Sequence, residues 1–106
     1  MTYKTVLDAL GDPTRRQIFA ALRAGPRSVA SLAEGLPISR PAVSQHLKIL
    51  KQAGLAAVEV QGTRRIYRLD QQGLLTLRSW VDEVWEETMD VYRAEIQRQI
   101  DERKST

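Results

Sequence analysis

Apolar residues recur at helical spacing near the start of the chain and predict two short helices there. The first is expected over Tyr3–Leu10, with Val6 and Leu7 on its apolar side. The sequence Asp12-Pro13-Thr14 predicts the start of the second, because a capping side chain followed by proline in the first turn is typical of a helix N-terminus. Gly25-Pro26 predicts its end.

Residues 28–54 predict two further helices joined by a tight turn, which is the plan of a helix-turn-helix. Ser28 and Ser39 are placed to cap them, since serine hydroxyls accept hydrogen bonds from the free N–H groups of a first helical turn. Gly35 is expected to end the first helix of the pair in a left-handed conformation, and Gly54 to close the second. Both helices therefore carry start and stop signals.

Short runs rich in β-forming residues follow, on either side of a turn at residues 61–64. They predict a hairpin, so residues 55–70 are expected to form a wing. Over residues 72–104 the pattern becomes one amphipathic helix, about 45 Å long if unbroken. The predicted fold is mainly α, with a two-stranded β-hairpin wing beside the helix-turn-helix and a long C-terminal dimerisation helix, in a single domain over residues 1–106.

The long helix carries more apolar surface than one small domain easily buries by itself. Its apolar residues recur at intervals of three and four, and two tryptophans widen the stripe. Aromatic residues are enriched in protein interfaces, which favours pairing with a second copy of the chain. The competing interpretation is that the stripe folds back onto its own domain, and both can hold in part. The residues expected at a dimer interface are Val6, Leu7, Leu77, Trp80, Val81, Val84, Trp85, Thr88, Val91 and Tyr92.

The second helix of the helix-turn-helix, which covers residues 40–52, has no acidic residue on any face. Surface helices ordinarily mix acids with bases, so this absence favours an anionic partner. Arg, Ser and Gln side chains suit base edges in the major groove of double-stranded DNA, whereas lysines suit phosphates. The residues expected to read bases are Arg40, Ser44 and Gln45, together with Pro41. The residues expected to bind DNA are Ser39, Arg40, Pro41, Ser44, Gln45, Lys48, Lys51, Arg64 and Arg65, the last two from the wing turn.

The net charge of +3 is unevenly distributed along the chain. Residues 1–70 hold eleven Lys and Arg against five Asp and Glu, whereas residues 71–106 hold five against eight. The basic charge thus lies with the predicted DNA reader, which supports the nucleic-acid interpretation.

Cysteine is absent from the sequence, so disulfides and thiolate metal ligands are excluded. This absence fits a reducing cytoplasm. No apolar run approaches the roughly 20 residues that span a bilayer, so no membrane partner is expected.

With these elements in place, the chain resembles the ArsR-type winged-helix repressors over nearly its whole length. The residues that carry the resemblance are Asp12-Pro13-Thr14-Arg15-Arg16 with Ile18, residues 39–50 (SRPAVSQHLKIL), Ala53-Gly54-Leu55, and the wing from Gly62 through Tyr67 to Leu69. The resemblance implies a homodimer in which the first and last helices pair. It also implies that two recognition helices enter successive major grooves of a pseudo-palindromic operator, and that binding blocks a promoter.

The sequence departs from the metal-sensing members that it resembles. Positions that hold cysteines in many of them are here Ser28, Ala30 and Ala33, which cannot bind a soft ion. The last helix has no histidine, and a run of five carboxylates over residues 82–90 is more often ordinary helix surface than a metal site. These residues are Asp82, Glu83, Glu86, Glu87 and Asp90. No metal and no cofactor is therefore expected.

The single histidine, His46, lies at the border of an apolar helix face and is expected to pack rather than to bind a ligand. It has no Cys or Ser partner for nucleophilic catalysis, and no phosphate-binding loop is present, so an enzyme is not expected. Two alternatives to the repressor stay open: a protein–protein adaptor with a winged-helix fold, and a metal-responsive repressor with an oxygen-ligand site. The sequence identifies neither an effector nor whether one exists; release from DNA by a small molecule, by an antagonist protein or by neither stays open.

Overall fold

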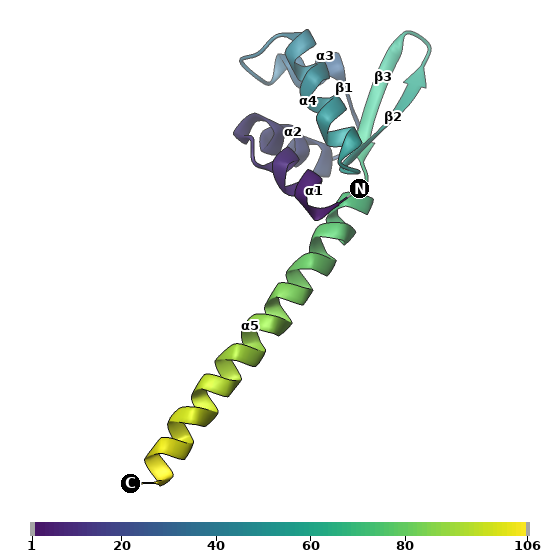
Figure 1. Ribbon diagram of the computed structural model, residues 1–106. Helices are drawn as coiled ribbons and strands as arrows, with labels where there is room; N and C mark the ends of the chain where they lie inside the picture. Colours follow the sequence, from purple (N-terminus) through teal and green to yellow (C-terminus); the bar gives the residue numbers. More distant parts are fainter. Residues whose placement is uncertain (1, 106) are drawn as a thin grey trace.

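The computed structural model describes residues 2–105, and over this range the chain is mainly helical with a small antiparallel sheet (Figure 1). The fold predicted from the sequence, a winged helix-turn-helix with a long last helix, is confirmed. In chain order the elements are α1 (Tyr3–Leu10), α2 (Pro13–Arg23), β1 (Arg27–Ser28), α3 (Val29–Glu34), α4 (Arg40–Gln52), β2 (Ala56–Gln61), β3 (Arg64–Leu69) and α5 (Gln72–Lys104).

Short polar side chains begin the helices of the domain. The Arg15 N–H donates to Asp12 Oδ2 at 2.9 Å at the start of α2, and the Ser31 N–H donates to Ser28 Oγ at 3.1 Å at the start of α3. Ser39 accepts from the Ala42 N–H at 3.3 Å at the start of α4. Each cap satisfies a backbone donor that the first turn leaves free. The predicted caps of the helix-turn-helix are therefore confirmed.

The expected left-handed conformation of Gly35 is wrong. Its φ is −89° and its ψ is 0°, in the right-handed region. The Gly35 N–H donates to the Leu32 carbonyl oxygen at 3.2 Å, so α3 ends in a regular tightened turn that needs no left-handed residue. Gly54, in contrast, has a φ of 70° and provides the left-handed residue after α4.

The wing is a hairpin to which a third, very short strand is added. The strand order is β1-β3-β2, and all pairs are antiparallel. Gln61 pairs with Arg64, so the turn consists of Gly62 and Thr63 alone, and Gly62 has the positive φ, 64°, that a type II′ turn places first. The sequence missed β1 because two residues are too few to show a strand pattern, and it assigned two strand-end residues to the turn.

The core lies where α1, α2 and α4 meet the base of the sheet. Its largest fully buried side chains are Ile18, Leu22, Leu47, Leu50, Leu55, Val6 and Val43. Val6 was expected at a dimer interface, and this is wrong, because its side chain is 0% exposed within a single chain and cannot reach a second one.

Two arginines of α2 fix α1 to the rest of the domain. Arg15 donates from Nε to the Ala9 carbonyl oxygen at 2.6 Å and from Nη2 to that of Asp8 at 3.1 Å. Arg16 Nη1 donates to the Leu10 carbonyl oxygen at 2.8 Å. The carbonyls of Ala9 and Leu10 lie in the last turn of α1, which leaves them without a partner inside the helix, whereas that of Asp8 also accepts from the Gly11 N–H at 3.2 Å. The two guanidinium groups thus supply hydrogen bonds that the end of the helix lacks. This part of the basic charge is therefore structural.

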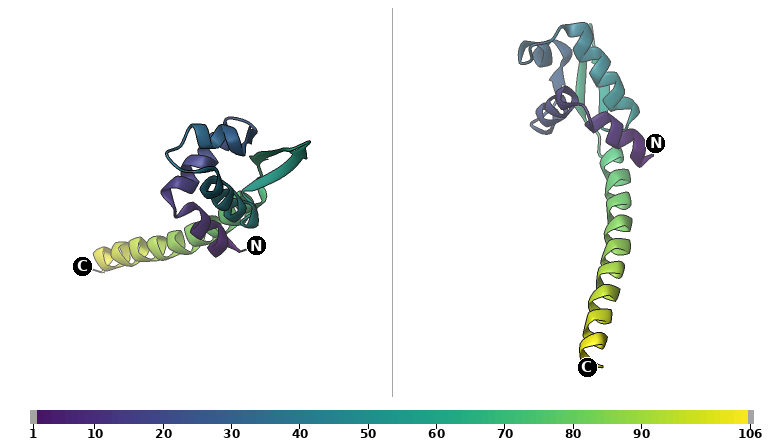
Figure 2. Two further views of the ribbon diagram at one scale, coloured as in Figure 1. Left: turned by 90° about the horizontal axis from the view of Figure 1, so that it is seen from above. Right: turned by 60° about the vertical axis from the view of Figure 1, so that its left-hand side comes forward.

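Helix α5 begins against the domain and then leaves it, which gives the molecule principal dimensions of 75 × 24 × 21 Å (Figure 2). Its first turns pack on α1, where Trp80 stacks on Tyr3 with ring centroids 4.8 Å apart and planes 9° from parallel. Across residues 2–105, no helix combines the length and the apolar character that a membrane span requires.

Candidate nucleic-acid interface

Helix α4 presents an exposed polar face because its apolar face is held in the core. Val43, Leu47 and Leu50 are each 0% exposed, and they fix the rotation of the helix about its axis. Ile49 was expected on the apolar side but is partly exposed, since it lies at the edge of the buried stripe. All the α4 residues expected to bind DNA are exposed. They are Arg40, Pro41, Ser44, Gln45, Lys48 and Lys51, and Ser39 just before the helix is exposed as well.

A groove runs between α4 and the wing. On its α4 side lie Ser44, Gln45, Lys48 and Lys51, and across from them lie Arg65 and Tyr67 of β3. Nearer the wing tip the groove is bounded by Arg40, Pro41 and Ser44 on one side and by Thr63, Arg64 and Arg65 on the other, with residues 28–30 at its end. The fold thus brings all but Ser39 of the expected DNA-binding residues onto one grooved surface.

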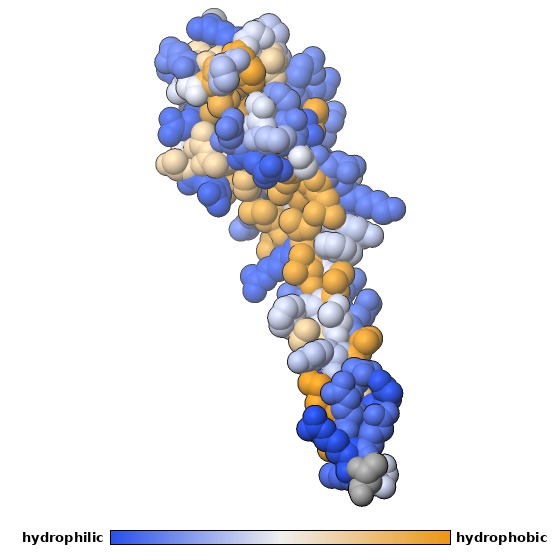
Figure 3. Space-filling model, turned by 90° about the vertical axis from the view of Figure 1, so that its left-hand side faces the viewer, coloured by the Kyte–Doolittle hydropathy of each residue, from blue (hydrophilic) through white to orange (hydrophobic). Residues whose placement is uncertain are grey.

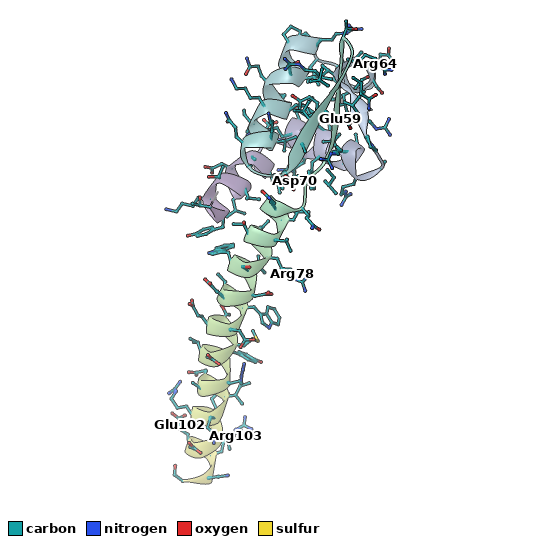
Figure 4. The ribbon with its side chains drawn as sticks, turned by 90° about the vertical axis from the view of Figure 1, so that its right-hand side faces the viewer. Glu59, Arg64, Asp70, Arg78, Glu102 and Arg103 are labelled. Atoms are coloured by element: carbon teal, nitrogen blue, oxygen red, sulfur yellow. The ribbon has the colours of Figure 1, made fainter. Side chains whose placement is uncertain are left out.

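Electrostatics make this surface suitable for a polyanion. None of the residues that border the groove is acidic, and five of them are lysine or arginine. Phosphates are bound by such cations, and serine and glutamine offer both donors and acceptors to base edges. Figure 4 shows Arg64 at the wing tip and Glu59 nearer the base of the wing.

His46 lies on the opposite border of α4 and joins it to α2. Its Nδ1 is 3.5 Å from Arg15 Nη1 and 4.0 Å from Asp12 Oδ2, and its side chain is 23% exposed. The hydrogen bond from the Arg15 backbone N–H, then the positive charge of Arg15, hold the pKa of the Asp12 carboxyl below its ordinary value. His46 therefore belongs to a polar contact between two helices, away from the groove.

The apolar stripe of α5 divides into a part that packs on its own domain and a part that remains exposed. Leu74 and Leu77 pack against the core, and Trp80 stacks on Tyr3. The rest forms what we call the apolar seam, which begins at α1 and continues down α5 (Figure 3). Its exposed members are Leu7, Val81, Val84, Trp85, Thr88, Val91, Tyr92, Ile96 and Ile100. Of the expected interface residues, Leu77 and Trp80 thus make contacts within the chain.

No group of three or more His, Cys, Asp or Glu side chains lies close enough to hold a metal ion anywhere in residues 2–105. The α5 carboxylates are spread along the helix, and Asp90 forms an exposed ion pair with Arg93 at 3.6 Å. Ser28 uses its hydroxyl to cap α3. Ala30 and Ala33 offer no ligand atom.

Sequence reasoning missed three parts of this arrangement. The hydrogen bonds of Arg15 and Arg16 to α1 leave no periodic signal, although the two arginines follow a cap and a proline. The Tyr3–Trp80 stack joins positions far apart in the chain. The groove itself arises only when the wing is placed beside α4.

Comparison with known proteins agrees with this geometry. Residues 10–59 match a family model described as "Helix-turn-helix domain". The chain is 51% identical over 84 residues to the HTH-type transcriptional regulator Rv2034 of Mycobacterium tuberculosis. These residues are 79% of this chain and 78% of that protein. The chain is also 37% identical over 76 residues to the transcriptional repressor SdpR of Bacillus subtilis, and these residues are 72% of this chain and 84% of that protein.

A solved structure shares the fold. The homodimeric winged helix-turn-helix DNA-binding domain Mb0332 from Mycobacterium bovis, described as a possible ArsR-family regulator, superimposes with a TM-score of 0.64 and 31% identity. The match covers 79% of this chain and 78% of that one. The chain therefore belongs to the ArsR-type family of winged helix-turn-helix transcriptional regulators.

Proposed function

We propose that this chain is a homodimeric repressor that binds a two-fold symmetric DNA operator and blocks transcription from it. The observation that carries the proposal is the grooved surface of α4 and the wing, which is basic, exposed and free of carboxylates. This role places its action in the cytoplasm, beside the DNA. SdpR, a relative of similar length, is named a transcriptional repressor, which supports the direction of the effect.

Within this function, α4 lies in the major groove. Arg40, Pro41, Ser44 and Gln45 contact base edges from its exposed face, and Lys48 and Lys51 hold phosphates along its side. Arg64 and Arg65 hold the strand that passes between α4 and the wing. Ser39 caps α4 at the point where the helix meets the DNA, so its role is to present the following residues.

The second copy of the chain covers the apolar seam. An exposed apolar surface as long as the apolar seam lowers solubility unless it is buried. A two-fold interface buries the apolar seam of both chains against each other. The Mb0332 domain is described as homodimeric, and its fold covers most of this chain. A two-fold dimer sets two α4 helices about one DNA turn apart, roughly 34 Å, and thereby defines a palindromic operator.

Release from DNA is not gated by a thiolate metal site in this proposal, since positions 28, 30 and 33 supply no soft ligand. An effector, if the protein has one, then acts elsewhere on the dimer.

The test is selection of duplexes from a random library by the purified full chain at physiological salt, followed by footprinting. The proposal expects an enriched inverted repeat, protection on one face of the DNA, and a dimer by sedimentation equilibrium. A dimer that enriches no sequence would overturn it and would favour the adaptor interpretation. Enrichment of one half-site without its inverted repeat, together with a monomeric protein in sedimentation equilibrium, would overturn the proposal that the chain binds as a dimer.

A further inference from the structure

A cavity of about 220 Å³ lies between α2 and α3 and is separate from the groove beside the wing. The two sites have no lining residue in common. Helix α3 packs mainly on α4, β1 and β3 and makes little contact with α2, so the cavity opens where these two helices do not meet. We call it the α2–α3 cavity. Nothing in the proposed function uses it.

Part of the lining of the α2–α3 cavity is apolar. Ala21 comes from α2, Leu32 from α3 and Leu36 from the turn that follows, and all three pack in or against the core. Since the core holds these side chains in place, the apolar wall exists before a ligand arrives. The cavity is smaller than the roughly 300 Å³ or more of sites for drug-sized molecules, so its size suits a short branched alkyl chain.

The rest of the lining is polar, and its side chains come from three different elements. Gln17 lies on α2, Arg27 on β1 and Ser31 on α3. None of the described residues that line the cavity is acidic. The guanidinium charge of Arg27 is therefore not neutralised by the lining, and the amide and hydroxyl groups near it can donate further hydrogen bonds.

Arg27 is held in an orientation that suits a carboxylate. Its Nε donates to the carbonyl oxygen of Ala21 at 3.2 Å, which fixes the guanidinium group beside the end of α2. Over residues 2–105, no carboxylate lies within ion-pair distance of Arg27. Its two terminal nitrogens can thus bind a carboxylate through two parallel hydrogen bonds.

We propose that the α2–α3 cavity binds a small molecule that joins one carboxylate to a short branched alkyl chain. Arg27 donates two hydrogen bonds to the carboxylate, which charge makes stronger than neutral ones. The alkyl chain leaves water and packs against Leu32 and Leu36. The bound molecule spans α2 and α3, and α3 in turn packs on α4.

The natural chain tests the class of ligand with three probes. Isovalerate carries both the carboxylate and the branched chain, isovaleramide keeps the shape without the charge, and acetate keeps the charge without the branched chain. Each is titrated into the isotope-labelled full chain, and backbone amide signals are followed by NMR. We expect isovalerate to bind with a dissociation constant of about 1 mM or below, and the other two at least about tenfold more weakly. The signals that move should be those of Ser31, Leu32, Gly35 and Leu36.

Variants assign the binding to Arg27. Arg27→Gln removes the charge, and we expect isovalerate to bind about tenfold or more weakly while isovaleramide binds as before. Arg27→Lys keeps the charge without the planar fork, so its affinity for isovalerate should lie between the two. Arg23→Gln is the matched control, because Arg23 is exposed in the last turn of α2 and does not line the cavity. We expect it to bind isovalerate as the natural chain does. Circular dichroism checks that each variant is folded.

Three results would overturn the inference. The first is equal affinity of the natural chain for isovalerate and isovaleramide, which needs no variant to fold. The second is no saturable movement of the cavity signals at about 10 mM isovalerate. The third is an equal loss of affinity in Arg23→Gln and Arg27→Gln. None of these results bears on DNA binding, because the α2–α3 cavity and the groove have no lining residue in common.

Discussion

Gly73 donates its backbone N–H to the carbonyl oxygen of Gly54 at 2.8 Å and so joins the start of α5 to the end of α4. A Cβ at residue 73 would collide with the carbonyl oxygen of Ala53 and would lie 3.1 Å from that of Gly54. Gly54 itself has a φ of 70°. The direction in which α5 leaves the domain, and with it the spacing of two recognition helices in a dimer, therefore depends on two glycines.

Gly73→Ala should destabilise the fold, because the added methyl group meets backbone atoms that cannot rotate away. We expect the free energy of unfolding to fall by about 1–3 kcal/mol, the usual cost of overpacking. Urea denaturation followed by circular dichroism measures the change at a fixed protein concentration.

Gly35→Ala is the matched control. Gly35 has right-handed dihedral angles, and a Cβ there would lie 3.9 Å from its nearest neighbour, the Leu32 carbonyl oxygen. We expect no loss, or a gain of about 0.4–1 kcal/mol from the stiffer unfolded chain. Equal destabilisation by both changes would contradict the close contact at Gly73.

Asp12→Asn should remove one source of acid sensitivity. Its folded pKa is lowered from 3.8 by the Arg15 N–H, by the charge of Arg15 and by His46, so the ionised carboxylate stabilises the fold above pH 3.8. That contribution is lost as the pH falls through the folded pKa. Asparagine retains the cap but not the charge.

We therefore expect the natural chain to be the more stable at pH 7 and the difference to shrink toward pH 3. Urea denaturation of both proteins across this range measures it. A difference that does not vary with pH would show that the carboxylate charge is unimportant and that shape alone determines the cap.

Much of the fold could be predicted because its signals are local. Ser28, Ser39 and Asp12 lie three residues before the N–H groups that they cap, and each is visible in a short stretch of sequence. The apolar spacing of α5 predicts its full length from Gln72 to Lys104. Such features depend on neighbouring residues and need no knowledge of tertiary contacts.

Apart from the local errors at Gly35 and in the short strand β1, the errors and omissions concern contacts between distant residues. Spacing places Val6 on an apolar face, but it does not say whether that face meets its own core or a second chain. The need for glycine at position 73 arises only because α4 ends against it. Likewise, Arg64 and Arg65 are adjacent in sequence, but the strand register places them on opposite faces of the wing.

Val84→Glu should dissociate the dimer. Val84 is an exposed member of the apolar seam, and a carboxylate there must be buried by the partner beside the acids already on α5. We expect the dimer dissociation constant to rise roughly a hundredfold, which corresponds to about 2.7 kcal/mol. Sedimentation equilibrium over a range of concentrations measures it.

Leu75→Glu is the control for this change. Leu75 is also an exposed apolar residue of α5, at 52%, but helical geometry places it nine residues before Val84 and therefore about 180° around the axis from it, on the opposite side of the helix. We expect it to leave the dimer unchanged. Dissociation by both variants, or by neither, would show that the seam is not the interface.

Gln45→Ala and Arg64→Ala should weaken DNA binding in different ways. Gln45 is on the exposed face of α4 and lacks a formal charge, so its loss should relax the preference for the operator over random DNA by about 1–3 kcal/mol. Arg64 lies at the wing tip, and its loss should weaken binding to both kinds of DNA alike. Because one phosphate contact disappears, the slope of log K against log salt should flatten by about one unit.

Arg93→Ala separates this effect from a general loss of positive charge. Arg93 carries the same charge, is exposed on α5 and forms an ion pair with Asp90, far along the chain from the groove. We expect its removal to leave both the affinity and the salt slope unchanged. Fluorescence anisotropy with operator and random duplexes at several salt concentrations distinguishes the three variants. If Gln45→Ala weakened binding to the two duplexes equally, α4 would contact the backbone without reading bases, and the assignment of roles within the groove would be wrong.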